Sequence, residues 1–92
     1  MIDLEQAIVI LIQWATETKA KGVTYTDFWV DEYPSCWVFS PCGPKGEILY
    51  VSRGISVSKE TGETGFYFPP DHPENRGKVE RIGNKPIHIN LK

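Results

Sequence analysis

The sequence predicts an α+β fold, in which an N-terminal helix packs on a curved antiparallel sheet of four or five strands. Three observations support this prediction. Apolar residues recur at helical spacing near the N-terminus, later segments alternate apolar and polar residues, and turns rich in glycine and proline separate those segments. A chain of 92 residues supports one hydrophobic core, so we expect a single domain over residues 1–92.

The helix is predicted over residues 4–21. Asp3 is a good N-cap, Gln6 completes a capping box, and Gly22 suits the left-handed residue that ends a helix. The β-branched residues at 8–10 would also fit a buried strand, but the length and both caps favour a helix. The apolar stripe comprises Leu4, Ala7, Ile8, Leu11 and Ala15, with Trp14 beside it, and Val9 and Ile12 widen it. A stripe of this width predicts a helix with much of its circumference covered.

The next part of the chain has the pattern of strands joined by turns. Turn-forming residues cluster at 41–46, and Gly62 within the turn 59–63 stands where a positive φ is needed. Residues 27–31 lack clean alternation, which indicates a bulge or a strand end. The strands are expected at residues 23–26, 36–40, 47–51, 55–58 and 66–68.

The last quarter of the chain carries weaker signals. Residues 69–75 are rich in proline and are expected to form a loop in which His72 is solvated. Residues 86–91 alternate strictly and predict an edge strand on which His88 is exposed.

Composition argues against several classes of protein. An aromatic content of 12% argues against disorder, and the longest apolar run, residues 7–12, is far shorter than the roughly 20 residues that a bilayer requires. A net charge of -2 argues against nucleic acid binding, which needs a basic surface. No basic segment precedes the first apolar run, as a secretory signal requires, so a cytoplasmic location is expected.

Charge is distributed unevenly along the chain. Residues 23–44 carry three acidic side chains and no basic one, whereas residues 71–92 carry five basic and three acidic side chains. Either the two segments neutralise each other in the fold, or the acidic segment attracts a basic partner.

The sequence indicates no metal and no cofactor. Cys36 and Cys42, with His72 and His88, lack zinc-ligand spacing, and no phosphate-binding glycine motif stands in the sequence. The two cysteines are expected to be free and buried, with a disulfide across the turn as the alternative under oxidising conditions. A cysteine nucleophile paired with His72 would also need a substrate cleft, for which so short a chain has little room. We therefore expect a protein that is not an enzyme.

Residues 27–33 combine three aromatic and three acidic side chains. Adjacent Asp31 and Glu32 point to opposite faces of a strand, so they do not form a carboxylate pair for acid–base catalysis. Tryptophan and tyrosine dominate protein-binding hot spots, and acidic neighbours favour a basic partner. The alternative is that residues 69–92 cover this segment within the fold. The candidate partner-binding residues are Asp27, Trp29, Asp31, Glu32 and Tyr33.

Two motifs resemble the small YrhB-like immunity-protein family. They are the strand Cys36-Trp37-Val38-Phe39 and, after a polar turn, the segment 51–63 that ends in Lys59-Glu60-Thr61-Gly62-Glu63. The likeness covers about residues 4–66, in which an N-terminal helix precedes the tryptophan-containing strand. The resemblance implies an intracellular antidote that binds a cognate toxin domain and blocks its active site without performing a reaction.

Three classes of function follow, in order of preference. The first is a non-enzymatic protein-binding module, an inhibitor of the immunity type whose protein partner would include a basic toxin domain. The second is a structural or accessory protein, either chaperone-like or self-associating as a homodimer. The third is a small-ligand-binding domain or an enzyme, with an apolar cavity between the helix and the sheet.

Overall fold

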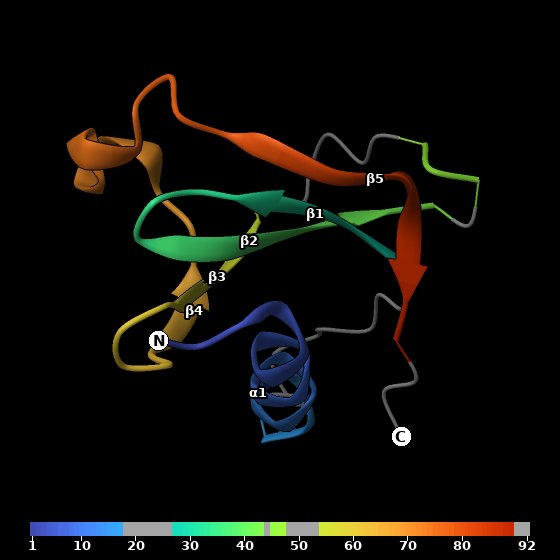
Figure 1. Cartoon of the computed structure of the whole chain (residues 1–92). Helices are drawn as coiled ribbons and strands as arrows, with labels where there is room; N and C mark the ends of the chain where they lie inside the picture. The colour runs from blue at the N-terminus through green and yellow to red at the C-terminus, as the bar shows by residue number, and fades with distance from the viewer. Residues whose placement is uncertain (18–26, 44, 48–53, 90–92) are drawn as a thin grey trace.

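The computed structural model describes residues 1–17, 27–43, 45–47 and 54–89. Within this part of the chain, five strands form one antiparallel sheet in the order β4-β3-β2-β1-β5, and one α-helix packs on it (Figure 1). This arrangement confirms the predicted α+β class. The elements are α1 (Leu4–Glu17), β1 (Asp27–Glu32), β2 (Cys36–Cys42), β3 (Ile55–Ser58), β4 (Thr64–Phe66), the 3₁₀ helices η2 (Pro69–Asp71) and η3 (Pro73–Asn75), and β5 (Glu80–His88).

α1 begins at the capping box that the sequence predicts. The Gln6 N–H donates to Asp3 Oδ1 at 2.9 Å, and the Asp3 N–H donates to Gln6 Oε1 at 3.0 Å. The first of these bonds satisfies a backbone donor that the first turn of a helix leaves unpaired. Three predictions lie outside the described residues: the helix end at 18–22, the strand at 23–26, and the strand at 47–51 apart from Glu47, which is not in a strand.

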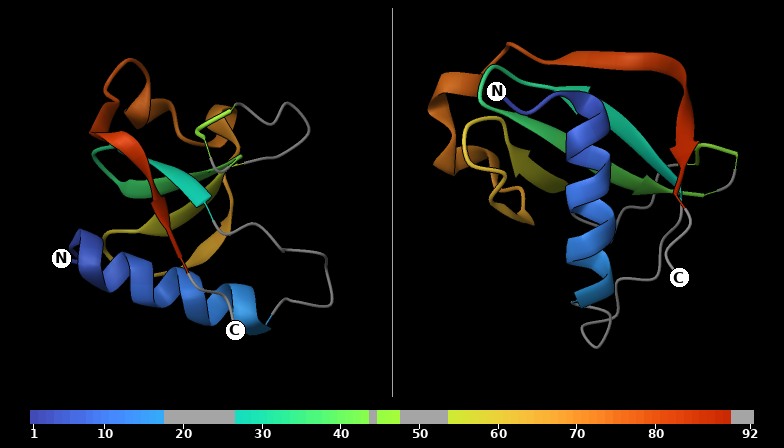
Figure 2. Two further views of the ribbon diagram at one scale, coloured as in Figure 1. Left: turned by 90° about the vertical axis from the view of Figure 1, so that its right-hand side faces the viewer. Right: turned by 60° about the horizontal axis from the view of Figure 1, so that its bottom comes forward.

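The register of the pairs around β2 divides the sheet into two faces. Val30 of β1 and Ile55 of β3 both lie opposite Phe39, so these three side chains share one face. α1 covers this face, and its buried Leu11 belongs to the same core cluster (Figure 2). The opposite face, called the open face below, carries the side chains of Trp29, Asp31, Cys36, Val38 and Ser56.

β5 pairs with β1 at one edge of the sheet, so the C-terminal segment forms an edge strand as predicted. The strand begins at Glu80, earlier than the predicted residues 86–91, because pairing with β1 starts there. Its register changes between Phe28 and Val30. The expected irregularity within residues 27–31 therefore affects the pairing with β5, whereas the pairing of β1 with β2 is continuous.

The extent predicted for the strand at 36–40 is wrong. β2 continues through Pro41, where a turn was expected, because Pro41 pairs with Phe28 of β1. In the described residues, β3 pairs with β2 as far as Phe39, and Pro41 pairs with β1.

Three further expectations differ in detail. β4 covers Thr64–Phe66 rather than residues 66–68, because pairing with β3 resumes directly after the turn at Gly62, whose φ is +75°. Val9 is 64% exposed, so α1 is covered over a narrower stripe than predicted. The residues at 69–75 form η2 and η3 rather than an irregular loop.

Cys36 and Cys42 are both buried and both free. They stand at the two ends of β2, and six strand residues span about 20 Å. A disulfide requires Cα atoms within roughly 7 Å of each other. The alternative of a disulfide between them is therefore wrong, because the turn on which it depended begins only after Cys42.

Replacing Asp3 with alanine is expected to lower the free energy of unfolding by about 1 kcal/mol, because the Gln6 N–H loses its acceptor. Urea unfolding followed by circular dichroism measures this change. Glu5→Ala leaves the capping box intact and is expected to change the same free energy by less than about 0.5 kcal/mol. Equal losses in the two variants would contradict the capping role.

Candidate functional site

On the open face, two of the predicted contact residues pair with the C-terminal strand. Asp31 is 9% exposed and accepts hydrogen bonds from Arg81 Nε at 2.9 Å and from Arg81 Nη2 at 3.3 Å. The Asp27 Oδ1 atom lies 3.0 Å from His88 Nδ1. Arg81 neutralises Asp31, and His88 engages Asp27, so both carboxylates are held within the chain by the C-terminal strand.

The other predicted residues are separated from one another. Glu32 lies on the α1 face, where its Oε2 atom is 2.7 Å from Lys59 Nζ. Trp29 lies on the open face but is engaged within the chain, because its Nε1 donates to the Gly46 carbonyl at 3.2 Å. The Arg81 guanidinium also lies 4.7 Å from its ring centroid. The acidic and aromatic stretch therefore does not form one continuous patch.

Tyr33, the last predicted residue, belongs to a surface that the sequence does not predict. Its ring centroid lies 5.2 Å from that of Tyr67, and the Tyr67 centroid lies 5.0 Å from that of His72. We name Tyr33, Tyr67 and His72 the ring stack. His72 was expected to be solvated, but stacking on Tyr67 leaves its side chain only 34% exposed.

A buried amide holds the ring stack against the sheet. Asn75 is 1% exposed, and its Oδ1 accepts from the Ser35 hydroxyl at 3.0 Å and from the Ser35 N–H at 3.4 Å. Its Nδ2 donates to Tyr67 Oη at 3.5 Å and to Cys36 Sγ at 3.7 Å. Because both ends of the amide are hydrogen-bonded, its burial carries little penalty, and η3 is fixed on the start of β2.

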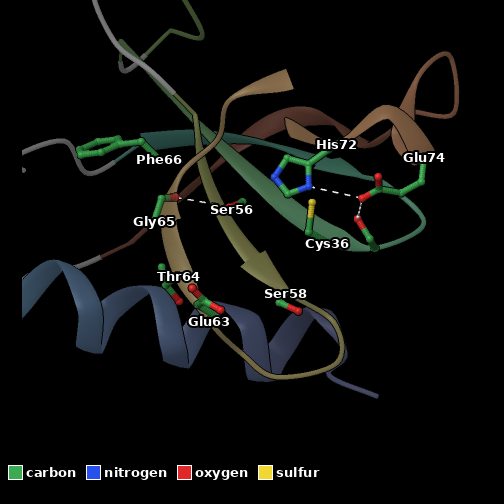
Figure 3. A pocket seen from close by; sticks show the side chains of 10 residues that line it. Cys36, Ser56, Ser58, Glu63, Thr64, Gly65, Phe66, His72 and Glu74 are labelled. Atoms are coloured by element: carbon green, nitrogen blue, oxygen red, sulfur yellow. Dashed lines mark hydrogen bonds and ion pairs between the residues drawn. The ribbon is translucent and has the colours of Figure 1, made fainter. Parts of the chain in front are cut away.

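Three hollows adjoin the ring stack. The inner groove, of about 370 Å³, is lined by Asp31, Tyr33, Val38, Ser40, Gly54, Tyr67, Phe68 and Pro69. The outer groove, of about 480 Å³, is lined by Tyr33, Tyr67, Pro69, Pro70, His72, Pro73, Asn75, Arg76, Gly77 and Val79. The polar hollow, of about 390 Å³, is lined by Ser35, Cys36, Ser56, Ser58, Glu63, Thr64, Gly65, Phe66, His72 and Glu74 (Figure 3).

The ring stack connects these hollows. The two grooves share Tyr33, Tyr67 and Pro69, and the polar hollow meets the outer groove at His72. The inner groove and the polar hollow lie over open-face residues such as Val38 and Ser56. They are therefore on the side of the sheet opposite the cavity that a ligand-binding domain was expected to have.

The polar hollow brings together Cys36, His72 and Glu74, groups that cysteine hydrolases use (Figure 3). Burial raises the pKa of the Cys36 thiol, although hydrogen bonds with Ser35 and Asn75 act in the opposite direction. The Nδ1 atom of His72 lies 3.4 Å from Glu74 Oε1, and the hydrogen bond to the sulfur comes from Asn75. A nucleophilic cysteine needs a base that lowers its pKa, so this geometry does not favour nucleophilic catalysis.

The polar hollow is rimmed by negative charge. A hydrogen bond with its own backbone N–H lowers the pKa of the Glu74 carboxyl, and bonds with His72 and Ser35 act in the same direction. Glu74 and Glu63 are both exposed. No lysine or arginine is among the described residues that line the hollow. The two carboxylates therefore leave a local excess of negative charge.

Comparisons with protein families, with curated proteins and with solved structures give no match. In the described part of the chain, no three histidine, cysteine, aspartate or glutamate side chains converge to hold a metal ion. None of the helices described there is long and apolar enough to cross a membrane. The geometry of the ring stack and its hollows is therefore the basis for assigning a function.

Asn75→Ala is expected to lower the free energy of unfolding by about 1–3 kcal/mol, because the buried amide is lost and the partly buried backbone N–H of Ser35 loses its acceptor. The matched control is Asn84→Ala. Because Asn84 is exposed on β5, its replacement should change the free energy of unfolding by less than about 0.5 kcal/mol. Chemical unfolding compares the two variants. Similar stabilities would show that the Asn75 amide does not hold η3 to the sheet.

The raised pKa of Cys36 predicts a thiol that is protonated at neutral pH and reacts slowly. Iodoacetamide labelling at pH 7, with mass spectrometry to assign the site, should give a rate below about one tenth of that of a free thiol. The rate should rise as the pH exceeds the ordinary cysteine value of 9.0. Faster labelling than a free thiol at neutral pH would indicate an activated nucleophile.

Proposed function

We propose that this protein is a non-enzymatic binding module that acts by holding another protein against the ring stack and the grooves beside it. In the immunity-type role implied by the family resemblance, the bound partner would be a toxin or enzyme whose active site becomes blocked. Binding of this kind needs a complementary surface and no catalytic group. Burial, which raises the pKa of the Cys36 thiol, is compatible with such a role.

The observation that carries the proposal is a set of large apolar side chains held at the surface around a rigid aromatic centre. Phe68 of the inner groove is 49% exposed, and Val79 of the outer groove is 51% exposed. Between them stand Tyr33 and Tyr67, whose stacked rings have little conformational freedom to lose on binding. Aromatic anchors surrounded by apolar grooves are typical of protein-binding hot spots.

Of the predicted contact residues, this proposal retains Tyr33 and, at the edge of the inner groove, Asp31. Asp27, Trp29 and Glu32 do not line the grooves. The proposed contact surface therefore lies next to the predicted segment and extends over residues 67–79.

Self-association is the second candidate function, and one feature favours it. Phe66 on the edge strand β4 is 54% exposed and packs edge-to-face against Trp14 with centroids 5.6 Å apart. Sedimentation velocity separates the candidates. A monomer that remains monomeric as its concentration rises supports the binding module, whereas a dimer that Phe66→Ser dissociates would support self-association.

Two exposed positions test the proposed surface. Affinity capture with the intact chain identifies candidate partners, which are then purified and titrated by calorimetry. Phe68→Ser and Val79→Ser should each raise the Kd of a genuine partner about tenfold, because each removes an apolar anchor from a groove.

Val9→Ser is the control matched to Val79→Ser, since Val9 is an exposed valine on α1 that lines neither groove. It should leave the Kd unchanged. A partner whose Kd responds to Val9→Ser and not to the groove variants would contradict the proposal. The proposal would also be contradicted if every captured protein bound the groove variants and the control with the same Kd.

A further inference from the structure

We infer that the two grooves receive an extended, proline-containing segment of the partner in the polyproline II conformation, with a basic residue of that segment over the polar hollow. The inference rests on the proposed function, because it names the chemistry of the partner that the same surface would bind. Its support comes from the spacing of the rings, from a hydroxyl donor between the grooves, and from the charges around the ring stack.

Two grooves separated by a ridge suit the repeat of such a segment. A polyproline II helix has three residues per turn and rises about 9 Å per turn, so side chains on one edge recur at that interval. Both grooves are lined by Tyr33 and Tyr67, whose stacked rings have centroids 5.2 Å apart. These two rings therefore form a ridge between the grooves that successive turns of a polyproline II segment could straddle.

The ring stack also offers a hydrogen-bond donor. Tyr67 Oη accepts a bond from Asn75 Nδ2 at 3.5 Å. The Tyr33 and Tyr67 hydroxyls also bond to each other, so one of their two protons is used between them and the other is left to be donated. Burial, followed by the neighbouring Tyr67 and Asp31, raises the pKa of Tyr33. The carbonyl groups of a polyproline II segment have no internal partners and can accept from such hydroxyls.

Charge around the ring stack selects and orients the segment. The polar hollow presents Glu63 and Glu74, whereas the outer groove is lined by Arg76. A basic residue is attracted to the polar hollow and repelled from the outer groove. It should therefore lie on the polar-hollow side of His72, the residue at which the two meet. Arginine suits this position because its planar guanidinium can bond a carboxylate through two N–H groups.

Other peptide conformations fit the surface less well. A helix of about 10 Å diameter needs a continuous apolar trough, and the ring stack divides this surface into two grooves. Addition of a strand needs a free sheet edge, and the inner groove lies over the face of β2, the central strand.

The test uses three capped synthetic peptides and the full chain. The first peptide has six prolines followed by two arginines, the second has six prolines followed by two glutamates, and the third replaces the prolines of the first with alternating glycine and serine. Binding is followed by ¹H–¹⁵N NMR titration. The first peptide should bind at least about fivefold more tightly than either of the others, with shifts centred on residues 67–79.

Two variants assign the interactions. In the variant Glu63→Gln/Glu74→Gln, the preference for arginine over glutamate should fall to about twofold or less, because both carboxylates of the polar hollow become neutral. Val79→Ser should weaken binding of both proline peptides about equally, while Val9→Ser changes neither. All four positions are exposed, so these substitutions should leave the fold intact, and the NMR spectra of the free variants verify that each is folded.

Three results would overturn the inference. The first is that the glycine–serine peptide binds as tightly as the proline peptide with the same charge, since attraction would then be electrostatic alone. The second is that neither proline peptide binds. The third is that Glu63→Gln/Glu74→Gln leaves the preference for arginine over glutamate unchanged. If these results appear while Phe68→Ser and Val79→Ser still weaken a purified protein partner, the proposed function stands and the inference about its partner fails.

Discussion

The buried amide of Asn75 is the interaction on which the candidate surface depends. It connects η3 to Ser35 and Cys36 at the start of β2 and to Tyr67 beyond the end of β4. Leaving either end of a buried amide unpaired is costly, so alternative placements of this segment that break these bonds are disfavoured. The same contacts that cover the start of β2 therefore also fix Tyr67, which stacks between Tyr33 and His72.

This anchoring explains why a short chain can expose aromatic side chains without losing its core. The core on the α1 face is complete without the ring stack, because Phe39, Ile55 and Leu11 are each at most 1% exposed there. On the open face, β2 carries three buried side chains, Cys36, Val38 and Cys42, each 4% exposed. The segment that follows β4 supplies part of their cover and leaves its outward-facing side chains for other contacts.

Local patterns were sufficient to predict most of the fold but little of the candidate site. The capping box at Asp3, the strand at 55–58 and the positive φ at Gly62 depend on neighbours in sequence, and each is confirmed. The extension of β2 through Pro41 depends on which strands flank it, which periodicity does not reveal. Asn75 meets Ser35 and Cys36 about 40 residues away, so no spacing within the sequence marks it.

Composition correctly identifies an acidic segment, but the fold gives its carboxylates a different role from the one predicted. The acidic segment at 27–32 suggested a surface that attracts a basic partner, but its carboxylates face basic side chains from β5 and from the turn after β3. Antiparallel pairing of β1 with β5 brings the opposite charges together, because Arg81 lies directly opposite Asp31. Among the described residues that line the polar hollow, no lysine or arginine faces Glu63, which belongs to a segment that composition did not single out. An electrostatic contribution to binding would therefore act at the polar hollow, next to the aromatic rings, rather than at the acidic segment 27–32. Because the polar hollow and the rings are adjacent, one short segment of a partner could make both the apolar and the charged contacts.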